Sequence, residues 1–379
     1  MVDVHGFVKP GFEPVRDAFA KNFEKGLESG ASCAVTKDGE FVVDLWAGEA
    51  DPSGRAWEED TIVNVYSTTK TMAAISVLTL ADHGEIDLSM PVAKYWPQFA
   101  QNDKAEITVS QVMSHSAGLS GFDPALPDTD CLYDWDACCE RLAAQTPWWE
   151  PGTASGYHAI TQGYLQGEIV RRVTGKTIGT FFREEIAGPL GADFHIGLDA
   201  DHDDRVAELV PPTYEVGEGL ERAGVESIAN RTMRSAAITG NEPRTREWRA
   251  AEIPAAGGIG NARSVARVHS MMACGGEVDG IRIMSEEGVA RAHEEQIRGT
   301  DLVMAAPLVF GNGFGLNDAK FPISPNERAF FWGGWGGSLA IIDRDARLSI
   351  AYVMNRMEAN LMGDPRGMSV AMAAFGSSI

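Results

Sequence analysis

The N-terminal part of the chain shows a helical pattern followed by two strand patterns. Between residues 12 and 27 apolar side chains recur every three or four positions, and Gly30 follows them, which predicts a helix. Residues 31–36 and 41–46 are short apolar runs joined across Asp38-Gly39, a dipeptide that suits a type I′ hairpin turn. We therefore expect an antiparallel sheet to begin here.

The C-terminal part predicts further strands and a closing helix. Residues 329–332, 338–342 and 348–354 are apolar runs connected by a Gly-rich turn and by Asp343-Arg344-Asp345. A Met- and Ala-rich helix is expected at about residues 366–375. Strands at both ends, with helices between them, predict one sheet assembled from the two termini.

The middle of the chain is predicted to be mainly helical. Residues 67–81 are apolar around nearly the whole circumference of a helix, which indicates a buried helix that ends at Gly84. Residues 86–197 contain several helix-like segments separated by Pro and Gly. Residues 199–252 are polar and weakly periodic, so we expect a long excursion that covers part of the molecule. A helix at 263–273 returns the chain to the sheet.

These patterns predict an α/β (α+β) architecture in two parts. Residues 1–84 and 253–379 are expected to form an α/β domain around a central antiparallel sheet flanked by helices. Residues 85–252 are expected to form a helical lobe that includes the excursion at about 199–252. A functional site is expected in the cleft between the two parts.

Composition narrows the classes of partner. The 379 residues are 44% hydrophobic and 23% charged, as in ordinary globular proteins. The formal net charge of −22 repels phosphate backbones and anionic membranes, so neither a nucleic acid nor a membrane is expected as a partner. The sequence shows neither a signal-peptide pattern nor a membrane-spanning apolar run, and it has five cysteines, an odd number. We expect a cytoplasmic protein, and the oligomeric state stays open.

Ser67 and Lys70 are the first candidate for chemistry. They form the only S-x-x-K sequence of the chain, and at the start of a helix this spacing puts both side chains on one face. A buried lysine loses solvation of its charged form, so its amine can accept a proton from the serine hydroxyl. By itself the motif is more often a helix N-cap beside an unrelated lysine. The apolar surroundings of Lys70 favour the catalytic interpretation.

Two other segments can complete such a site. Tyr157 lies in a turn-rich loop ahead of a predicted helix, and its phenol could share a proton with Lys70, although a core or surface aromatic is the plainer interpretation of this loop alone. Residues 331–338 are Gly-rich within a strand pattern, where a backbone amide can complete an oxyanion hole. Glycines that merely shape a hairpin are an equally good explanation of that second segment.

Taken together, the motifs resemble those of a known family. The order S-x-x-K, Tyr and a late Gly-rich strand looks like the serine β-lactamase and penicillin-binding protein superfamily. The closer resemblance is to the family VIII carboxylesterases, relatives of class C β-lactamases. It rests on six segments: Asp44-Leu45-Trp46-Ala47-Gly48, Tyr66-Ser67-Thr68-Thr69-Lys70, Met113-Ser114-His115-Ser116-Ala117-Gly118-Leu119, Glu150-Pro151-Gly152-Thr153, Gly188-Pro189-Leu190-Gly191 and Trp332-Gly333-Gly334.

The resemblance implies a β-lactamase-like fold and a set of roles. Ser67 would be the acylated nucleophile, Lys70 and Tyr157 the proton-transfer pair, and the amides of Ser67 and Trp335 the oxyanion hole. It implies neither a metal nor an organic cofactor. The residues expected to contact the substrate are Trp332, Gly333, Gly334, His158 and Phe122.

Two departures from the superfamily pattern favour a neutral ester substrate. Tyr157-His158-Ala159 replaces the Tyr-x-Asn or Ser-x-Asn motif, and Trp332-Gly333-Gly334 replaces Lys-Thr-Gly, so an amide and a cation that would meet a β-lactam are missing. We expect a serine carboxylesterase that hydrolyses short-chain acyl or aryl esters of small molecules. A β-lactamase or D-amino-acid peptidase, an acyltransferase of the same fold and a non-catalytic ligand-binding relative remain open alternatives.

Overall fold

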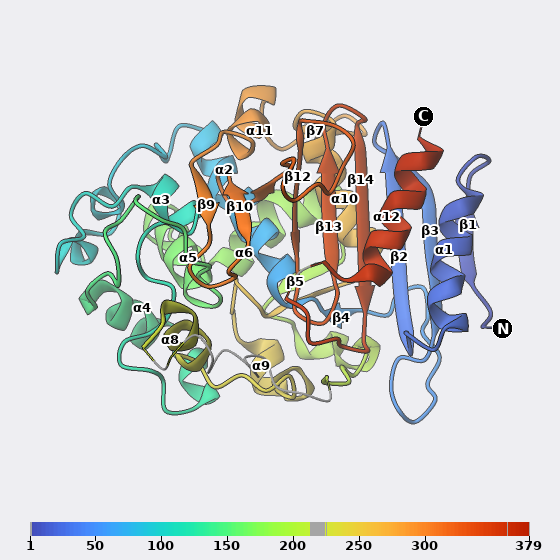
Figure 1. Cartoon of the computed structure of the whole chain (residues 1–379), viewed down its shortest axis with the longest axis horizontal. Coiled ribbons are helices and arrows are strands. Elements are labelled where there is room, and N and C mark those ends of the chain that lie inside the picture. Colours follow the sequence, from blue (N-terminus) through green and yellow to red (C-terminus); the bar gives the residue numbers. More distant parts are fainter. Residues whose placement is uncertain (1, 213–223, 225, 362, 379) are drawn as a thin grey trace.

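A nine-stranded antiparallel sheet organises the molecule (Figure 1). The computed structural model describes residues 2–212, 224, 226–361 and 363–378. From one edge to the other the strands are β1 (His5–Val8), β3 (Glu40–Gly48), β2 (Gly30–Lys37), β14 (Leu348–Met354), β13 (Leu339–Asp343), β12 (Ala329–Gly333), β11 (Gly315–Leu316), β10 (Pro307–Phe310) and β9 (Ile297–Thr300). A small second sheet has the order β4 (Val63–Asn64), β6 (Gly258–Gly260) and β5 (Phe194–Ile196), and a hairpin pairs β7 (Glu277–Val278) with β8 (Ile281–Arg282).

The centre of the large sheet joins the two ends of the chain, as predicted. Strand β14 pairs with β2 in a register that sets Ile350 opposite Val35. The predicted hairpin between β2 and β3 is also confirmed, because Asp38 and Gly39 both have positive φ angles, 52° and 84°, as a type I′ turn requires.

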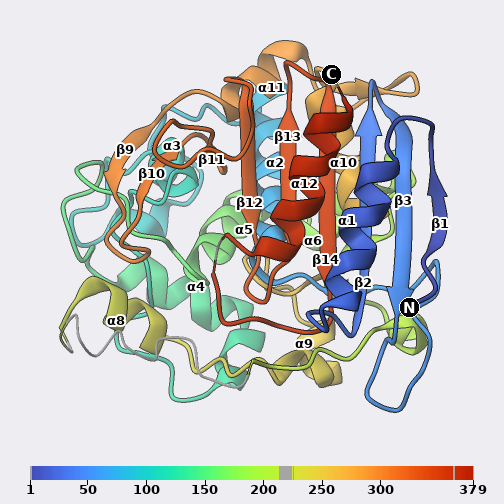
Figure 2. The same ribbon diagram turned by 45° about the vertical axis from the view of Figure 1, so that its right-hand side comes forward.

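Helices cover both faces of the sheet. Figure 2 shows α1 and α12 in front of the strands, with α2 and α10 behind them, while α3, α4, α5 and α8 lie on the side of β9 and β10. The helices are α1 (Glu13–Glu24), α2 (Thr69–Asp82), α3 (Val109–Met113), α4 (Trp135–Ala144), α5 (Thr161–Thr174), α6 (Ile178–Phe182), α7 (Gly188–Leu190), α8 (Ile228–Arg234), α9 (Arg246–Ala250), α10 (Ala262–Ala273), α11 (Glu286–Ala292) and α12 (Pro365–Ser377).

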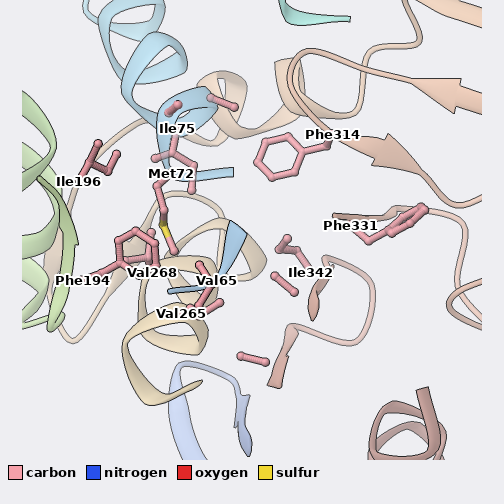
Figure 3. Close-up of a cluster of buried hydrophobic side chains, with 14 of the residues drawn as sticks. Val65, Met72, Ile75, Phe194, Ile196, Val265, Val268, Phe314, Phe331 and Ile342 are labelled. Carbon is pink, nitrogen blue, oxygen red and sulfur yellow. The ribbon is translucent and has the colours of Figure 1, made fainter. Parts of the chain in front are cut away.

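The main core lies between α2, α10 and the sheet. Met72 of α2, Val265 of α10 and Ile342 of β13 belong to one buried cluster, part of which is shown in Figure 3. Each such side chain contributes about 1.5–3 kcal/mol through its removal from water. Helix α2 is buried along its length from Thr69 to Ala81, as its uniformly apolar sequence predicts. This burial fixes the helix that carries Lys70 in its first turn and directly follows the turn that contains Ser67.

Strands at both edges of the sheet were not predicted from the sequence. Strand β1 is exposed at three of its four residues, and β9 has no buried residue. An edge strand with little buried surface needs no alternation of apolar and polar residues, so its sequence lacks the usual strand pattern.

The excursion predicted at residues 199–252 is described in part. It contains a 3₁₀ helix at Ala200–Arg205 as well as α8 and α9, while residues 213–223 and 225 lie outside the described residues. Among the helices that the structure describes, none combines the length and the apolarity needed to cross a lipid bilayer. All five cysteines are free thiols.

Candidate active site

Ser67 lies where a short 3₁₀ turn, Tyr66–Thr68, runs into α2. Tyr66, the residue before it, has a φ angle of 44°, in the left-handed region that side chains other than glycine rarely adopt. Such backbone strain persists only where the surroundings enforce it, and it clusters at functional sites. The Tyr66 ring is buried between Trp248 and Trp335, with ring centroids 6.2 Å and 5.0 Å away, and this packing holds the turn.

Lys70 is buried next to the Ser67 hydroxyl. Its Nζ lies 3.1 Å from Ser67 Oγ, 2.7 Å from the Ala159 carbonyl oxygen and 2.9 Å from the Ala255 carbonyl oxygen. Burial lowers the pKa of the amine well below its ordinary value, because the charged form loses its hydration. A neutral amine has two N–H groups, which match the two carbonyls, and one lone pair, which matches the Ser67 O–H.

Tyr157 contacts Ser67 from the opposite side. Its phenol donates a hydrogen bond of 2.6 Å to Ser67 Oγ, and Lys70 Nζ lies 4.8 Å from the centre of its ring. Burial raises the pKa of Tyr157 to about 12, against a smaller lowering effect of the Ser67 hydrogen bond. The phenol therefore keeps its proton at neutral pH. Ser67 Oγ can accept from Tyr157 and donate to Lys70 at the same time.

The Gly-rich segment after β12 approaches the Ser67 backbone closely. A Cβ atom at Gly334 would lie 2.1 Å from the Val65 carbonyl oxygen and 3.2 Å from the Ser67 nitrogen, so only glycine fits. Ser338 Oγ donates to the Val65 carbonyl over 2.7 Å and lies 2.9 Å from Thr68 Oγ1.

The backbone amides of Ser67 and Trp335 are available in this arrangement. Within the described part of the chain, neither amide donates a hydrogen bond to another protein group. Both amides therefore meet one requirement of an oxyanion hole, which is a backbone N–H without another acceptor.

An apolar pocket of about 80 Å³ opens at Ser67. Part of its wall comes from the segment around α8, through Thr232, Met233, Ala236 and Ile238. None of the described residues that line it is charged. The full lining is Tyr66, Ser67, Tyr157, Ala159, Ile160, Thr232, Met233, Ala236, Ile238, Ala256, Trp335 and Leu361.

Asp301 supports Tyr157 and was not identified from the sequence. Its buried Oδ1 accepts hydrogen bonds from the backbone amides of Tyr157, Val303 and Met304, at 3.1, 2.9 and 2.9 Å. Two of these bonds are local turn contacts that any aspartate can make. The bond to Tyr157 spans 144 positions, so only the fold shows it.

His158 and Phe122 lie outside the set of residues that line the pocket. His158 is fully buried, with Nδ1 2.6 Å from the Gly156 carbonyl oxygen and Nε2 accepting from the Leu119 amide over 3.1 Å. Both ring nitrogens are thus engaged in holding the Tyr157 loop. Phe122 is buried against Tyr164, with ring centroids 6.0 Å apart.

Trp332 and Gly333, which are expected to contact the substrate, are the last two residues of β12. The Trp332 indole is buried with its ring centroid 5.3 Å from that of Tyr157, whereas Trp335 lines the pocket directly. Among the residues that the structure describes, no group of three or more His, Cys, Asp or Glu side chains is arranged to hold a metal ion.

Comparison with known proteins places this geometry in a family. Residues 19–374 match the beta-lactamase family. The chain belongs to the beta-lactamase family. The esterase/beta-lactamase LipL of Mycobacterium tuberculosis is 38% identical over 375 residues, which cover 95% of this chain and 84% of that protein.

Solved structures of the beta-lactamase family agree with this assignment. A crystal structure of a family VIII carboxylesterase is 44% identical with a TM-score of 0.92, covering 99% of this chain and 100% of that one. A penicillin-binding protein homologue from Caulobacter crescentus is 41% identical with a TM-score of 0.90 and the same coverage. The beta-lactamase-like fold and the resemblance to family VIII carboxylesterases, both predicted from sequence, are confirmed.

Proposed function

We propose that this chain is a serine carboxylesterase that hydrolyses short-chain acyl or aryl esters of small molecules through an acyl-enzyme on Ser67. The observation that supports it most directly is the position of Ser67 Oγ between Lys70 Nζ at 3.1 Å and Tyr157 Oη at 2.6 Å. A hydroxyl held between a buried amine and a protonated phenol has a proton acceptor and a proton donor within reach.

The acylation step uses each of these groups. Ser67 Oγ attacks the ester carbonyl carbon while its proton moves to the neutral amine of Lys70, and the C=O electron pair moves to the oxygen. That oxyanion lies against the amides of Ser67 and Trp335. When the tetrahedral intermediate collapses, the bond to the alcohol oxygen breaks, and Lys70 returns the proton to it through Tyr157. Water then repeats the sequence and releases the acid.

The pocket favours a neutral substrate with a small acyl group. Its volume of about 80 Å³ suits a few carbon atoms, and its described lining has no charged side chain. A β-lactam presents a carboxylate that such a lining cannot pair with, and leaving a charge unpaired away from water is costly. The names of the relatives, which include esterases and a carboxylesterase, support the same substrate class.

We also propose that the enzyme works in the cytoplasm and without nucleic-acid or membrane partners. Its five free thiols suit a reducing compartment. The net charge of −22 opposes binding to polyanions and to anionic bilayers.

Steady-state rates with p-nitrophenyl acetate, p-nitrophenyl butyrate and the β-lactam nitrocefin test this function. We expect ester turnover by the wild type to exceed nitrocefin turnover, and Ser67→Ala to lower ester turnover by at least about 10³-fold. Nitrocefin hydrolysis faster than ester hydrolysis would assign the chain to the β-lactamases instead. An unchanged rate in Ser67→Ala would remove Ser67 from the mechanism.

A further inference from the structure

The turn that contains Trp335 is built from residues with little conformational preference. Gly336 and Gly337 have φ angles of 100° and 123°, a region open to glycine at no steric cost. Two adjacent glycines leave the isolated turn free to adopt other conformations as well. The direction of the Trp335 amide must therefore be fixed by contacts from outside the turn.

Arg366, near the start of α12, makes such a contact. Its side chain is 1% exposed, and Nη2 donates to the Gly336 carbonyl oxygen over 2.5 Å. The turn lies directly on this guanidinium, because a Cβ atom at Gly337 would be 2.5 Å from Nη2. The glycine at position 337 is thus needed for the contact itself.

The guanidinium is held rigidly by its other partners. Asp364 accepts from Nε over 3.0 Å and from Nη2 over 2.7 Å, in a bidentate pair. Nη1 donates to the carbonyl oxygens of Arg356 and Leu27, at 2.8 and 3.3 Å. All five N–H groups of Arg366 are engaged. A lysine, with three donors on one atom, cannot reproduce this set.

Two peptide groups, joined to each other by a hydrogen bond, connect Arg366 to the Trp335 amide. The Gly336 carbonyl that Arg366 binds belongs to the same planar peptide as the Gly337 N–H, and the two point in opposite directions. That N–H donates to the Gly334 carbonyl over 3.1 Å. The Gly334 carbonyl in turn shares a peptide with the Trp335 N–H, which points away from it. Fixing Gly336 therefore fixes the direction of the Trp335 N–H.

We propose that Arg366 is a positioning residue for the oxyanion hole, acting through the Gly336 carbonyl to aim the Trp335 amide at the reacting oxygen. This inference rests on the proposed esterase function. The Gly336 carbonyl also accepts from the Glu358 amide over 3.1 Å, so removing Arg366 takes away one of two outside contacts on this carbonyl and loosens the direction of the Trp335 amide. Transition-state stabilisation is then reduced while the apolar pocket that binds the ground state is retained, so kcat falls and KM changes little.

The test compares kcat and KM for p-nitrophenyl acetate in the wild type, Arg366→Met and Arg366→Lys. Removing one oxyanion-hole donor costs about 10²–10³-fold in kcat, so misdirecting it should cost about 10–100-fold. We expect kcat of Arg366→Met to fall by this factor, while its KM stays within about threefold of the wild type. The fall in kcat should be no larger in Arg366→Lys than in Arg366→Met. A trifluoromethyl ketone, which forms a tetrahedral oxyanion on Ser67, should lose affinity by the same factor as kcat/KM.

Arg267→Met is the matched control. Arg267 is also mostly buried and binds a backbone carbonyl, that of Leu190 at 3.1 Å, and a carboxylate, that of Asp279 at 2.5 Å, but it does not contact the turn. We expect it to retain wild-type kcat at temperatures below its melting transition. If Arg366→Met does not fold, Arg366→Lys, which keeps the charge beside Asp364, is measured alone.

The possible outcomes distinguish a failure of the positioning role of Arg366 from a failure of the proposed esterase function. Folded Arg366 variants with kcat within twofold of the wild type would overturn the positioning role while leaving the esterase intact. A wild type without ester turnover would overturn the proposed function, and the positioning role with it. An equal loss in Arg267→Met would show that general loosening of the fold, and not the turn, lowers the rate.

Discussion

At the scale of single residues, the proposed chemistry depends on where protons reside around Ser67. Burial acts in opposite directions on its two partners, lowering the pKa of Lys70 and raising that of Tyr157 to about 12. In both cases the uncharged form is favoured, because a low-dielectric site destabilises charge. Both shifts favour a resting site in which a neutral amine, a neutral hydroxyl and a neutral phenol are connected by hydrogen bonds. Such a site needs no counter-ion.

The expected pH dependence of kcat/KM follows from the lowered pKa of Lys70 and the raised pKa of Tyr157. The neutral amine of Lys70 is required, so the rate should rise with pH through the lowered pKa of Lys70 and reach a plateau below pH 10.5. Tyr157 stays protonated up to about pH 12, so no decline is expected across the plateau. A pH–rate profile with a neutral ester measures this. A rate that falls with rising pH across the neutral range would contradict the assignment of Lys70 as the base.

The variant Lys70→Arg tests the assignment of Lys70 as the base. An arginine stays charged at all pH values used, so it cannot accept the Ser67 proton. We expect kcat to fall by at least about 10³-fold, without the rising limb of the wild type. Its melting temperature should be recorded alongside, and a folded Lys70→Arg enzyme that keeps the wild-type profile would show that another group is the base.

At the scale of elements, α8 and the residues after it form part of the wall of the pocket at Ser67. Arg231 of this helix places its guanidinium 4.0 Å from the centre of the Trp148 ring and pairs with Asp123 over 2.9 Å. Thr232 hydrogen-bonds with Ser120 over 2.6 Å. These contacts hold Met233 at the pocket wall.

Met233→Ala should therefore extend the range of acyl groups that are accepted. Each buried methylene contributes about 0.8 kcal/mol, so two additional ones correspond to about tenfold. We expect the ratio of kcat/KM for p-nitrophenyl hexanoate to that for acetate to rise by about this factor. Met372→Ala, at a methionine of α12 that is 70% exposed, serves as the control and should leave the ratio unchanged. An unaltered chain-length profile in Met233→Ala would show that the acyl group binds elsewhere.

Elements with a local pattern were predictable from sequence, and elements without one were not. The uniformly apolar run that forms α2 predicts a buried helix, and Asp38-Gly39 predicts a hairpin. Both predictions succeed because these two structures depend mainly on residues that are close in the sequence. The exposed edge strand β1 has no such pattern. It forms because it pairs with the outer edge of β3, a strand that is distant in the sequence.

The same distinction applies to the site. Ser67 and Lys70 are three residues apart on one helical turn, so their meeting follows from helix geometry. The contact of Asp301 with the Tyr157 amide, and that of Arg366 with Gly336, depend on the complete fold. The substrate contacts expected for His158 and Phe122 remain predictions, and neither residue is among those that line the pocket.

At the scale of the whole molecule, a buried titratable side chain connects the two ends of the chain. Glu28, which follows α1, accepts hydrogen bonds from Tyr352 of β14 over 2.6 Å and pairs with Arg366 of α12 over 3.1 Å. Its side chain is fully buried, and burial raises its pKa to about 8 in spite of the nearby arginine. Glu28, Tyr352 and Arg366 all belong to the α/β domain that is predicted from the sequence.

Glu28 makes the stability of the fold depend on pH. The folded protein keeps a proton on Glu28 up to about pH 8, while the unfolded chain loses it near the ordinary pKa of 4.5. The folded state therefore binds more protons between these values, and the free energy of unfolding falls as pH rises from about 4.5 to 8. The loss is on the order of a few kcal/mol, since one pKa unit corresponds to about 1.4 kcal/mol.

Glu28→Gln removes the titrating group but keeps its shape. We expect the fall in unfolding free energy between pH 5 and pH 8, measured by urea denaturation, to be smaller in Glu28→Gln than in the wild type. Glu24→Gln, at an exposed residue of α1, is the control and should follow the wild type. Identical pH dependence in all three proteins would place Glu28 in its ordinary ionised state.

The proposed mechanism requires a covalent bond between the acyl group and Ser67 Oγ, and intact-protein mass spectrometry after treatment with a fluorophosphonate measures the reactivity of this hydroxyl. We predict a single adduct on the wild-type protein, located on the peptide that contains Ser67, and no adduct on Ser67→Ala under the same conditions. An adduct of equal yield on Ser67→Ala, or a wild type that hydrolyses esters while remaining unlabelled, would contradict the account.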